Sequence, residues 1–174
     1  MITSEAARNI LNFILFQIGW FTCVVYPDLI GPLVVVAFLV IHFVLVSQHR
    51  FTELQFIGLG VLVGSLLDGL WLNAGILSDG NTGDEHLITP VWLVAIWAIF
   101  MTTLSHSLNW ISRKVWLAFV FAPIAGPLAY WSASKLGNVA LTDLPLSLAA
   151  LALGWFIVFP LLLFIRKSLY PELV

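Results

Sequence analysis

The chain has 174 residues, of which 61% are hydrophobic and 9% are charged, and its mean hydropathy is +1.04. Soluble domains carry roughly a quarter charged residues, so this composition is typical of a membrane protein. The formal net charge of −2, without a Lys/Arg cluster interleaved with aromatic residues, excludes nucleic acid as a partner. Cys23 is the only cysteine, which excludes an internal disulfide bond.

Apolar residues occur in blocks of roughly 17 to 25, the length that a helix needs to cross a bilayer and too long for the strands of an outer-membrane barrel. Turn-forming and polar residues separate six such blocks. In chain order they predict spans at about residues 9–26, 33–47, 54–77, 90–111, 115–136 and 144–165. We therefore expect an all-α integral membrane bundle of six transmembrane helices, which forms a single domain over residues 1–174.

Lys and Arg in short loops mark the cytoplasmic side of a membrane protein, because they resist translocation. With the amino terminus in the cytoplasm, nearly all of the basic residues fall on that side. These residues are Arg8, Arg50, Arg113, Lys114, Arg166 and Lys167. Only Lys135 falls on the opposite side, which also receives the long polar loop at residues 78–89. We expect both termini to be cytoplasmic.

The third span carries one carboxylate, Asp68, within a stretch that is otherwise apolar. Gly60, Gly64 and Asp68 recur every four residues and therefore share one face of a helix. Small residues on that face allow a neighbouring backbone to come close to the acid. Asp68 is therefore expected to face protein and not lipid.

Three polar side chains fall at a similar predicted depth, namely Gln17 in the first span, His42 in the second and Asp68 in the third. An isolated carboxylate in hydrocarbon costs several kcal/mol, so we expect these groups to form a midplane cluster. The cluster is either a structural network that sets helix register or a proton-handling, ligand-binding or catalytic site. Trp71, one turn beyond Asp68, is a candidate wall for a lipid-like ligand, with core packing as the alternative.

A second polar group is predicted closer to the cytoplasm. Asn9 and Asn12 on the first span are three residues apart and share a face, and so do His106 and Asn109 on the fourth. The alternative for His106 is an interfacial histidine that bonds to water or to lipid head groups.

The fifth span carries a stripe of small residues at Ala122, Gly126, Ala129 and Ala133. This stripe is complementary to the Gly60 and Gly64 face of the third span, so we expect these two helices to form a close pair. The alternative is that small residues fill membrane helices without selecting a partner.

No known catalytic motif occurs in the sequence, and the catalytic residues stay unassigned. The four histidines do not have the clustered spacing of membrane di-iron oxygenases, and a haem-ligating pair of His42 and His106 has no supporting motif. The loop from Asp79 onward lacks the glycine and the late glutamate of a calcium-binding loop. We expect no metal and no cofactor.

Four segments carry a family resemblance. They are NFILFQIGWF at 12–21, LLDGLW at 66–71, PVWLVAIWAIF at 90–100 and GPLAYWSASKLG at 126–137. Together they resemble a bacterial inner-membrane family catalogued as domain of unknown function 2878, over nearly the whole chain. The resemblance implies a multi-pass protein of the bacterial inner (cytoplasmic) membrane and assigns no activity. Members of the family are encoded near fatty-acid-modifying enzymes, which implies a lipid-linked role.

The sequence is compatible with two classes of function and does not establish whether the protein is an enzyme. In the first, the protein binds, modifies or moves a lipid or another apolar small molecule at a polar site around Asp68. In the second, it is a non-enzymatic scaffold or accessory subunit that packs through small-residue faces, either as a homo-oligomer or against another membrane protein. Membrane lipids are expected partners in both classes. A lipid-sized cavity that reaches Asp68 favours the first class, and a tightly packed midplane with an exposed glycine seam favours the second.

Overall fold

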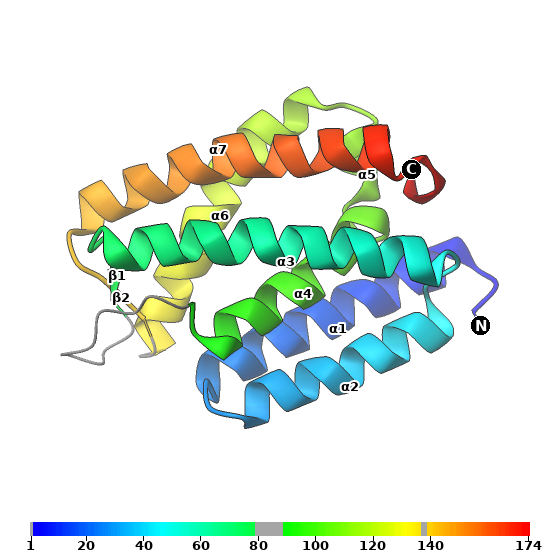
Figure 1. Ribbon diagram of the computed structural model, residues 1–174, viewed down its shortest axis with the longest axis horizontal. Coiled ribbons are helices and arrows are strands. Elements are labelled where there is room, and N and C mark those ends of the chain that lie inside the picture. Colours follow the sequence, from blue (N-terminus) through cyan, green and yellow to red (C-terminus); the bar gives the residue numbers. More distant parts are fainter. Residues whose placement is uncertain (1, 79–88, 137–138) are drawn as a thin grey trace.

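The computed structural model describes residues 2–78, 89–136 and 139–174. These residues form α-helices, one 3-10 helix and a pair of two-residue strands (Figure 1). In chain order the elements are α1 (Glu5–Val25), α2 (Ile30–Leu45), α3 (Arg50–Asn73), β1 (Leu77–Ser78), α4 (Val91–Ser105), α5 (Asn109–Ser112), α6 (Trp116–Leu136), β2 (Ala140–Leu141), α7 (Leu144–Leu169) and η1 (Pro171–Leu173). The predicted all-helical class is confirmed, whereas most of the polar loop predicted at residues 78–89 lies outside the described residues.

Within the described part of the chain, four helices are long and apolar enough to cross a membrane, namely α1, α3, α6 and α7. The helices α2 and α4 are also apolar but have 16 and 15 residues. At 1.5 Å per residue these two helices are about 24 and 22 Å long. Large apolar side chains cover the outside of the bundle, including Leu29, Phe51 and Phe164, each at least two-thirds exposed. Such a surface suits lipid and not water, so the chain forms the helical bundle of a membrane protein.

Side-chain caps begin two of the long helices. The hydroxyl of Ser4 accepts from the backbone N–H of Ala7 at the start of α1. The carboxylate of Asp143 accepts from the backbone N–H of Leu146 at 3.0 Å, and Pro145 occupies the first turn of α7. These residues satisfy backbone donors that have no partner within the helix.

The predicted fourth span, residues 90–111, is wrong in one respect, because it is not a single helix. Helix α4 ends at Ser105, and His106 leaves the helical conformation with φ −130° and ψ −95°. A short helix, α5, begins at Asn109. The break leaves backbone groups near the end of α4 without their usual partners within the helix.

Side chains from two other helices satisfy groups at this break. The backbone N–H and the hydroxyl of Ser107 both donate to Oδ1 of Asn12, from α1. The guanidinium of Arg166, from α7, donates to the carbonyl oxygen of Leu104. Irregular backbone inside a membrane protein is tolerated where protein groups replace the lost hydrogen bonds, as they do here.

Helix α4 packs against α1, α2 and α3, and its neighbour α3 closes over it through small residues (Figure 1). A Cβ atom added to Gly64 would lie 1.9 Å from the ring of Trp97, and one added to Gly60 would lie 2.1 Å from Sδ of Met101. The small-residue face of α3 therefore admits two large side chains of α4.

The predicted close pair of the third and fifth spans is wrong. The Gly60 and Gly64 face packs on α4, whereas α6 packs along α7, where Gly126 admits the ring of Trp155. A glycine on a helix admits either a neighbouring backbone or a large side chain, so complementary small-residue stripes do not identify the partner.

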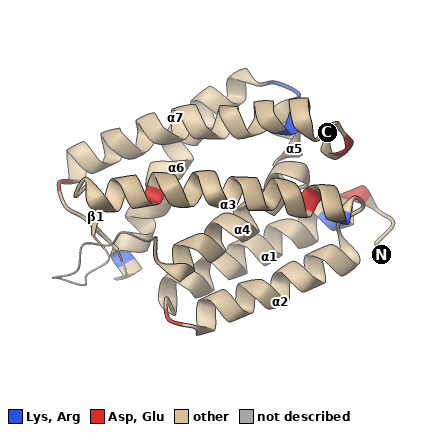
Figure 2. Cartoon of the chain, in the orientation of Figure 1, with Lys and Arg blue, Asp and Glu red and all other residues tan. Residues whose placement is uncertain are grey.

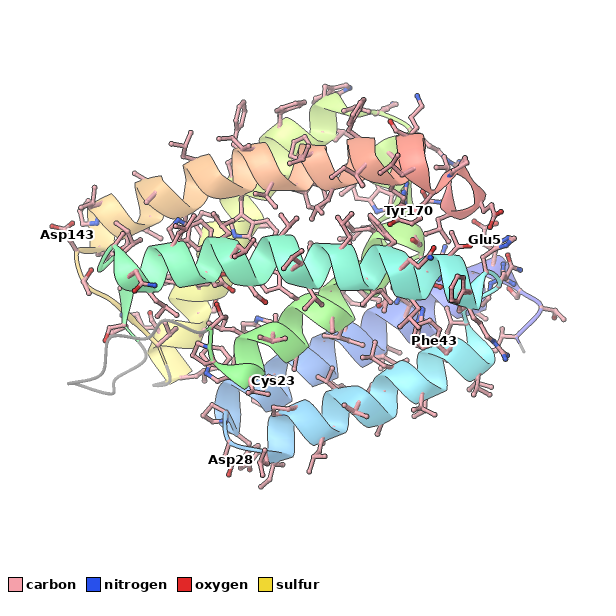
Figure 3. The ribbon with its side chains drawn as sticks, in the orientation of Figure 1. Glu5, Cys23, Asp28, Phe43, Asp143 and Tyr170 are labelled. Atoms are coloured by element: carbon pink, nitrogen blue, oxygen red, sulfur yellow. The ribbon has the colours of Figure 1, made fainter. Side chains whose placement is uncertain are left out.

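Both chain termini lie at one end of the bundle (Figure 1). Glu5 and Tyr170 lie at this end, and Asp28 and Asp143 lie at the other (Figure 3). Figure 2 shows the Lys and Arg segments gathered at the end with the termini, apart from one at the opposite end. At that opposite end, β1 and β2 pair antiparallel and join the end of α3 to the start of α7.

The fit of Trp97 against α3 predicts a large difference between two glycine substitutions. We expect Gly64→Ala to lower the free energy of unfolding by about 1–3 kcal/mol, because the new methyl group overlaps the Trp97 ring. Gly58→Ala in the same helix is the control, since a Cβ atom there meets nothing within 4 Å. It should be neutral or stabilise the helix by up to about 1 kcal/mol. Unfolding in detergent measures both variants, and equal losses would contradict this packing.

Candidate functional site

Asp68 lies on α3 with its side chain fully buried, and it accepts two hydrogen bonds from neighbouring helices. The indole Nε1 of Trp97, on α4, donates to Oδ2 at 2.7 Å. The hydroxyl of Tyr130, on α6, donates to Oδ1. The expectation that Asp68 faces protein is met, and three helices converge on its carboxyl group.

A cavity of about 720 Å³ reaches Asp68. Its walls come from α1, α4, α5, α6 and α7 and are mainly apolar and aromatic. The side chains around its deep end include Trp97, Phe100, Tyr130, Trp155 and Phe159. Sites for small molecules usually have volumes of about 300–1,000 Å³ and few polar groups, so this cavity has the size and character of a ligand site.

The cavity is open at the side of the bundle. Its lining includes Phe21 of α1, Trp110 of α5, and Phe121 and Leu128 of α6, which are 52%, 49%, 46% and 50% exposed. These side chains belong to the outer surface of the apolar bundle, so the mouth lies between α1 and α6. A molecule dissolved in the hydrocarbon of a bilayer could enter there without crossing water.

Two further polar groups line this cavity. The indole Nε1 of Trp155 is buried and has no hydrogen-bond partner among the residues that the structure describes. Its ring stacks on that of Trp97, with centroids 5.2 Å apart and planes 9° apart. Gln17 of α1 lines the cavity with an exposed side chain. The unpaired donor of Trp155 is therefore available to an acceptor on a bound molecule.

Of the residues predicted for the midplane cluster, His42 lies elsewhere. Its Nε2 is 2.9 Å from Oε1 of Glu53, which precedes Asp68 by fifteen positions on α3. This separation is about 22 Å along the helix. His42 is in the last turn of α2, close to the end of the bundle, so the predicted contact between His42 and Asp68 is wrong.

The other predicted members lie near Asp68 in different ways. Gln17 shares the cavity with Asp68, as described above. The ring of Trp71 packs edge-on against that of Tyr130, with centroids 5.6 Å apart, and rests over Gly154. Trp71 thus supports the Tyr130 side chain from behind. Ala122, Gly126, Ala129 and Ala133, predicted as a helix-packing stripe, line the cavity from α6.

A second polar centre lies at the end of the bundle that holds the termini. Oε1 of Glu53 lies 2.9 Å from Nε2 of His42 and 3.0 Å from Nε2 of His106. His42 and Glu53 are buried, and His106 is 12% exposed. The centroids of the two imidazole rings are 5.0 Å apart, so two histidines that are remote in sequence lie side by side.

The asparagines predicted for the second group surround this centre. Asn9 and Asn109 line the same polar cavity as Glu53 and His106. Nδ2 of Asn12 donates to Oγ1 of Thr102 at 2.8 Å, and Oδ1 of Asn12 accepts from the backbone N–H of Ser107 at the break after α4. The grouping of Asn9, Asn109 and His106 is therefore present in the structure, with Asn12 adjoining it.

Sequence reasoning missed Glu53 and Arg166. The predicted third span began at residue 54, so Glu53 was left outside it, whereas α3 begins at Arg50. The available signal was the tight turn between α2 and α3, which places the last turn of one helix beside the first turn of the next. Arg166 was counted only as a basic residue at a span end, although its side chain is fully buried.

The model of the protein family DUF2878, described as a protein of unknown function, matches residues 9–161. The chain belongs to this family. No curated protein and no solved structure matches the chain. Membership of DUF2878 confirms the resemblance seen in the sequence and assigns no activity, so any function has to be inferred from the two polar centres.

Removal of one donor to Asp68 predicts a loss of stability. We expect Tyr130→Phe to lower the free energy of unfolding by about 1–3 kcal/mol, because it leaves one oxygen of a buried carboxyl group without its partner. The control is Tyr26→Phe, which alters a tyrosine that is 52% exposed. Thermal unfolding in detergent compares the two. A Tyr130→Phe protein as stable as the control would contradict a stabilising bond to Asp68.

The Arg166 contacts predict a second difference between neighbouring residues. Arg166 donates to the Leu104 carbonyl and, at 2.8 Å, to Oδ1 of Asn109, whereas Lys167 is exposed. We expect Arg166→Met to lower the free energy of unfolding by about 2–3 kcal/mol, since hydrogen bonds to charged groups are strong. Lys167→Met should change it by less than about 0.5 kcal/mol. Equal effects in the same unfolding assay would show that the buried contacts contribute nothing.

Proposed function

We propose that the protein spans the bacterial inner membrane six times, with both termini in the cytoplasm. The gathering of Lys and Arg at the end with the termini supports this orientation (Figure 2). The short helix α2 packs against α1 and α4, and α4 packs against α1, α2 and α3. A span a few ångströms shorter than the hydrocarbon is accommodated by local thinning of the bilayer at modest cost.

We further propose that the protein binds a lipid or another apolar small molecule in the cavity that ends at Asp68. One observation carries this proposal: an apolar cavity of about 720 Å³ opens sideways between two helices and meets a buried carboxyl group at its inner end. Polar groups inside a membrane protein are costly and commonly mark functional sites. Binding of this molecule, with or without its modification or movement, is the role that fits this cavity.

The groups at the inner end of the cavity indicate how the molecule would be oriented. The unpaired indole donor of Trp155 would hold an acceptor oxygen, and the Asp68 carboxyl group with its Tyr130 partner would meet a hydroxyl or amide. The aromatic walls and the side opening suit an apolar chain. We therefore propose a ligand with one small polar head and a hydrocarbon tail that extends toward the mouth.

The scaffold alternative loses one of the small-residue faces on which it depended. Trp97 and Met101 cover the Gly60 and Gly64 face inside the bundle, so this face is not available to a partner. A homo-oligomer or a membrane-protein partner would have to use another surface.

Filling the cavity tests the proposed binding. Ala129 lines the cavity from α6, whereas Ala149 on α7 is exposed and does not line it. We expect gently purified wild-type protein to carry an apolar molecule, detected by native mass spectrometry and lipid analysis. Ala129→Trp should reduce the bound amount at least tenfold, because the indole occupies the cavity, and Ala149→Trp should retain it.

As a control, size-exclusion profiles and unfolding temperatures will show whether both tryptophan variants are folded. A second variant, Trp155→Phe, keeps the aromatic wall and removes only the indole donor, so it should weaken binding without emptying the cavity. Equal amounts of bound molecule in wild type, Ala129→Trp and Ala149→Trp would overturn the proposal, since the molecule would then be associated with the outer surface.

A further inference from the structure

Three side chains with metal-ligating atoms meet where α2, α3 and α4 come together. They are His42 from the last turn of α2, Glu53 from the first turn of α3, and His106 directly after α4. One ligand atom from each lies within 4.8 Å of the other two. The break after Ser105 places His106 here. The backbone N–H of His106 donates to the Thr103 carbonyl, and the backbone of His106 leaves the helical conformation.

The spacing of these atoms matches a shared metal ion. Zinc binds histidine nitrogen and carboxylate oxygen at about 2.0–2.2 Å, so neighbouring ligands around one ion lie about 3 Å apart. Glu53 Oε1 lies 2.9 Å from Nε2 of His42 and 3.0 Å from Nε2 of His106. Two histidines and one carboxylate, with other positions open, are a recurrent set for zinc and for non-haem iron.

The orientation of the two imidazole rings also permits coordination. An imidazole that binds metal through Nε2 carries its proton on Nδ1. Within the described part of the chain, Nδ1 of His42 is buried and has no hydrogen-bond partner, and Nε2 of both histidines faces Oε1 of Glu53. A metal ion at this position would replace the protons that the two Nε2 atoms share with Glu53.

A polar cavity of about 200 Å³ is lined by two of the three side chains, Glu53 and His106. This volume is large enough for water molecules that would complete the coordination of an ion. Among the described residues on its walls, Glu5, Glu53 and Glu172 carry carboxylates and Arg8 carries a guanidinium. This excess of negative charge favours a cation.

We propose that His42, Glu53 and His106 bind one divalent transition-metal ion, of which zinc is the representative. The site is independent of the proposed apolar ligand, since Glu53 lies about 22 Å along α3 from Asp68. Nitrogen ligands distinguish it from a calcium or magnesium site, which would be built from oxygen. Its open positions face the polar cavity and therefore the solvent at the end of the bundle with the termini.

Zinc titration of the full chain in detergent, after treatment with a chelator, tests the proposal. We expect wild-type protein to bind one zinc ion per chain, measured by calorimetry and by elemental analysis. Glu53→Gln and His106→Ala should each weaken binding at least tenfold. The matched control is His49→Ala, because His49 lines the same cavity, is half-exposed and lies outside the three-residue cluster. It should bind zinc as wild type does.

A measurement on the wild-type protein keeps the test decisive if a cluster variant fails to fold. X-ray absorption of the zinc-loaded protein should show two imidazole nitrogens and carboxylate oxygen at about 2.0–2.2 Å. The proposal is overturned if the wild type binds no zinc, if the absorption spectrum shows no imidazole, or if His49→Ala loses binding as much as Glu53→Gln does. The cluster would then be a hydrogen-bonded network that joins three helices.

Discussion

A bilayer offers no water to a buried polar group, and the arrangement of this bundle follows from that constraint. Asp68 is buried on α3, and it is stabilised because α4 and α6 each bring one donor to its carboxyl oxygens. These two bonds require Trp97 to cross the face of α3, which in turn requires the glycine at position 64. Asp68, Trp97 and Gly64 therefore depend on one another. The indole donates to the buried carboxyl group, and the glycine leaves room for the indole ring.

The same constraint explains the interruption between α4 and α5. A continuous helix through His106 would satisfy its own backbone and would carry this side chain further around the helix. The chain instead leaves the helix, and side chains from α1 and α7 satisfy the exposed groups, with Asn12 bonding to Ser107 and Arg166 bonding to Leu104. Replacing backbone bonds by side-chain bonds costs conformational freedom in those side chains. What the break provides in return is a histidine that reaches Glu53.

The helical class, the position of most helices and the burial of Asp68 could be predicted from the sequence, because hydropathy and helix periodicity report them directly. The side-chain contacts between helices could not be predicted. The span bounds placed His42 near the middle of the second span, whereas it lies in the last turn of α2 beside Glu53, about 22 Å along α3 from Asp68, so the predicted contact of His42 with Asp68 is wrong. Glu53 lies at a helix start, where hydropathy treats an acid as a boundary and not as a buried group. The local sequence pattern indicates which face of a helix is buried and where the helix ends, whereas the pairing of helices depends on the packing of the whole bundle.

Two helices, α3 and α4, contribute to both polar centres, and this sharing gives the centres different properties. The Asp68 centre combines a carboxyl group, two hydrogen-bond donors and a wall of aromatic rings, so it can recognise a small polar head. The Glu53 centre has histidine nitrogens and a polar cavity with more acidic than basic side chains, so it suits a cation better than an apolar chain. Since α3 and α4 are packed through close glycine contacts between the two centres, neither helix can shift at one centre without disturbing that packing. A pair of helices packed through glycine contacts thus holds an apolar cavity at one centre and a polar cavity at the other, which is the arrangement that the proposed binding of two unlike molecules requires.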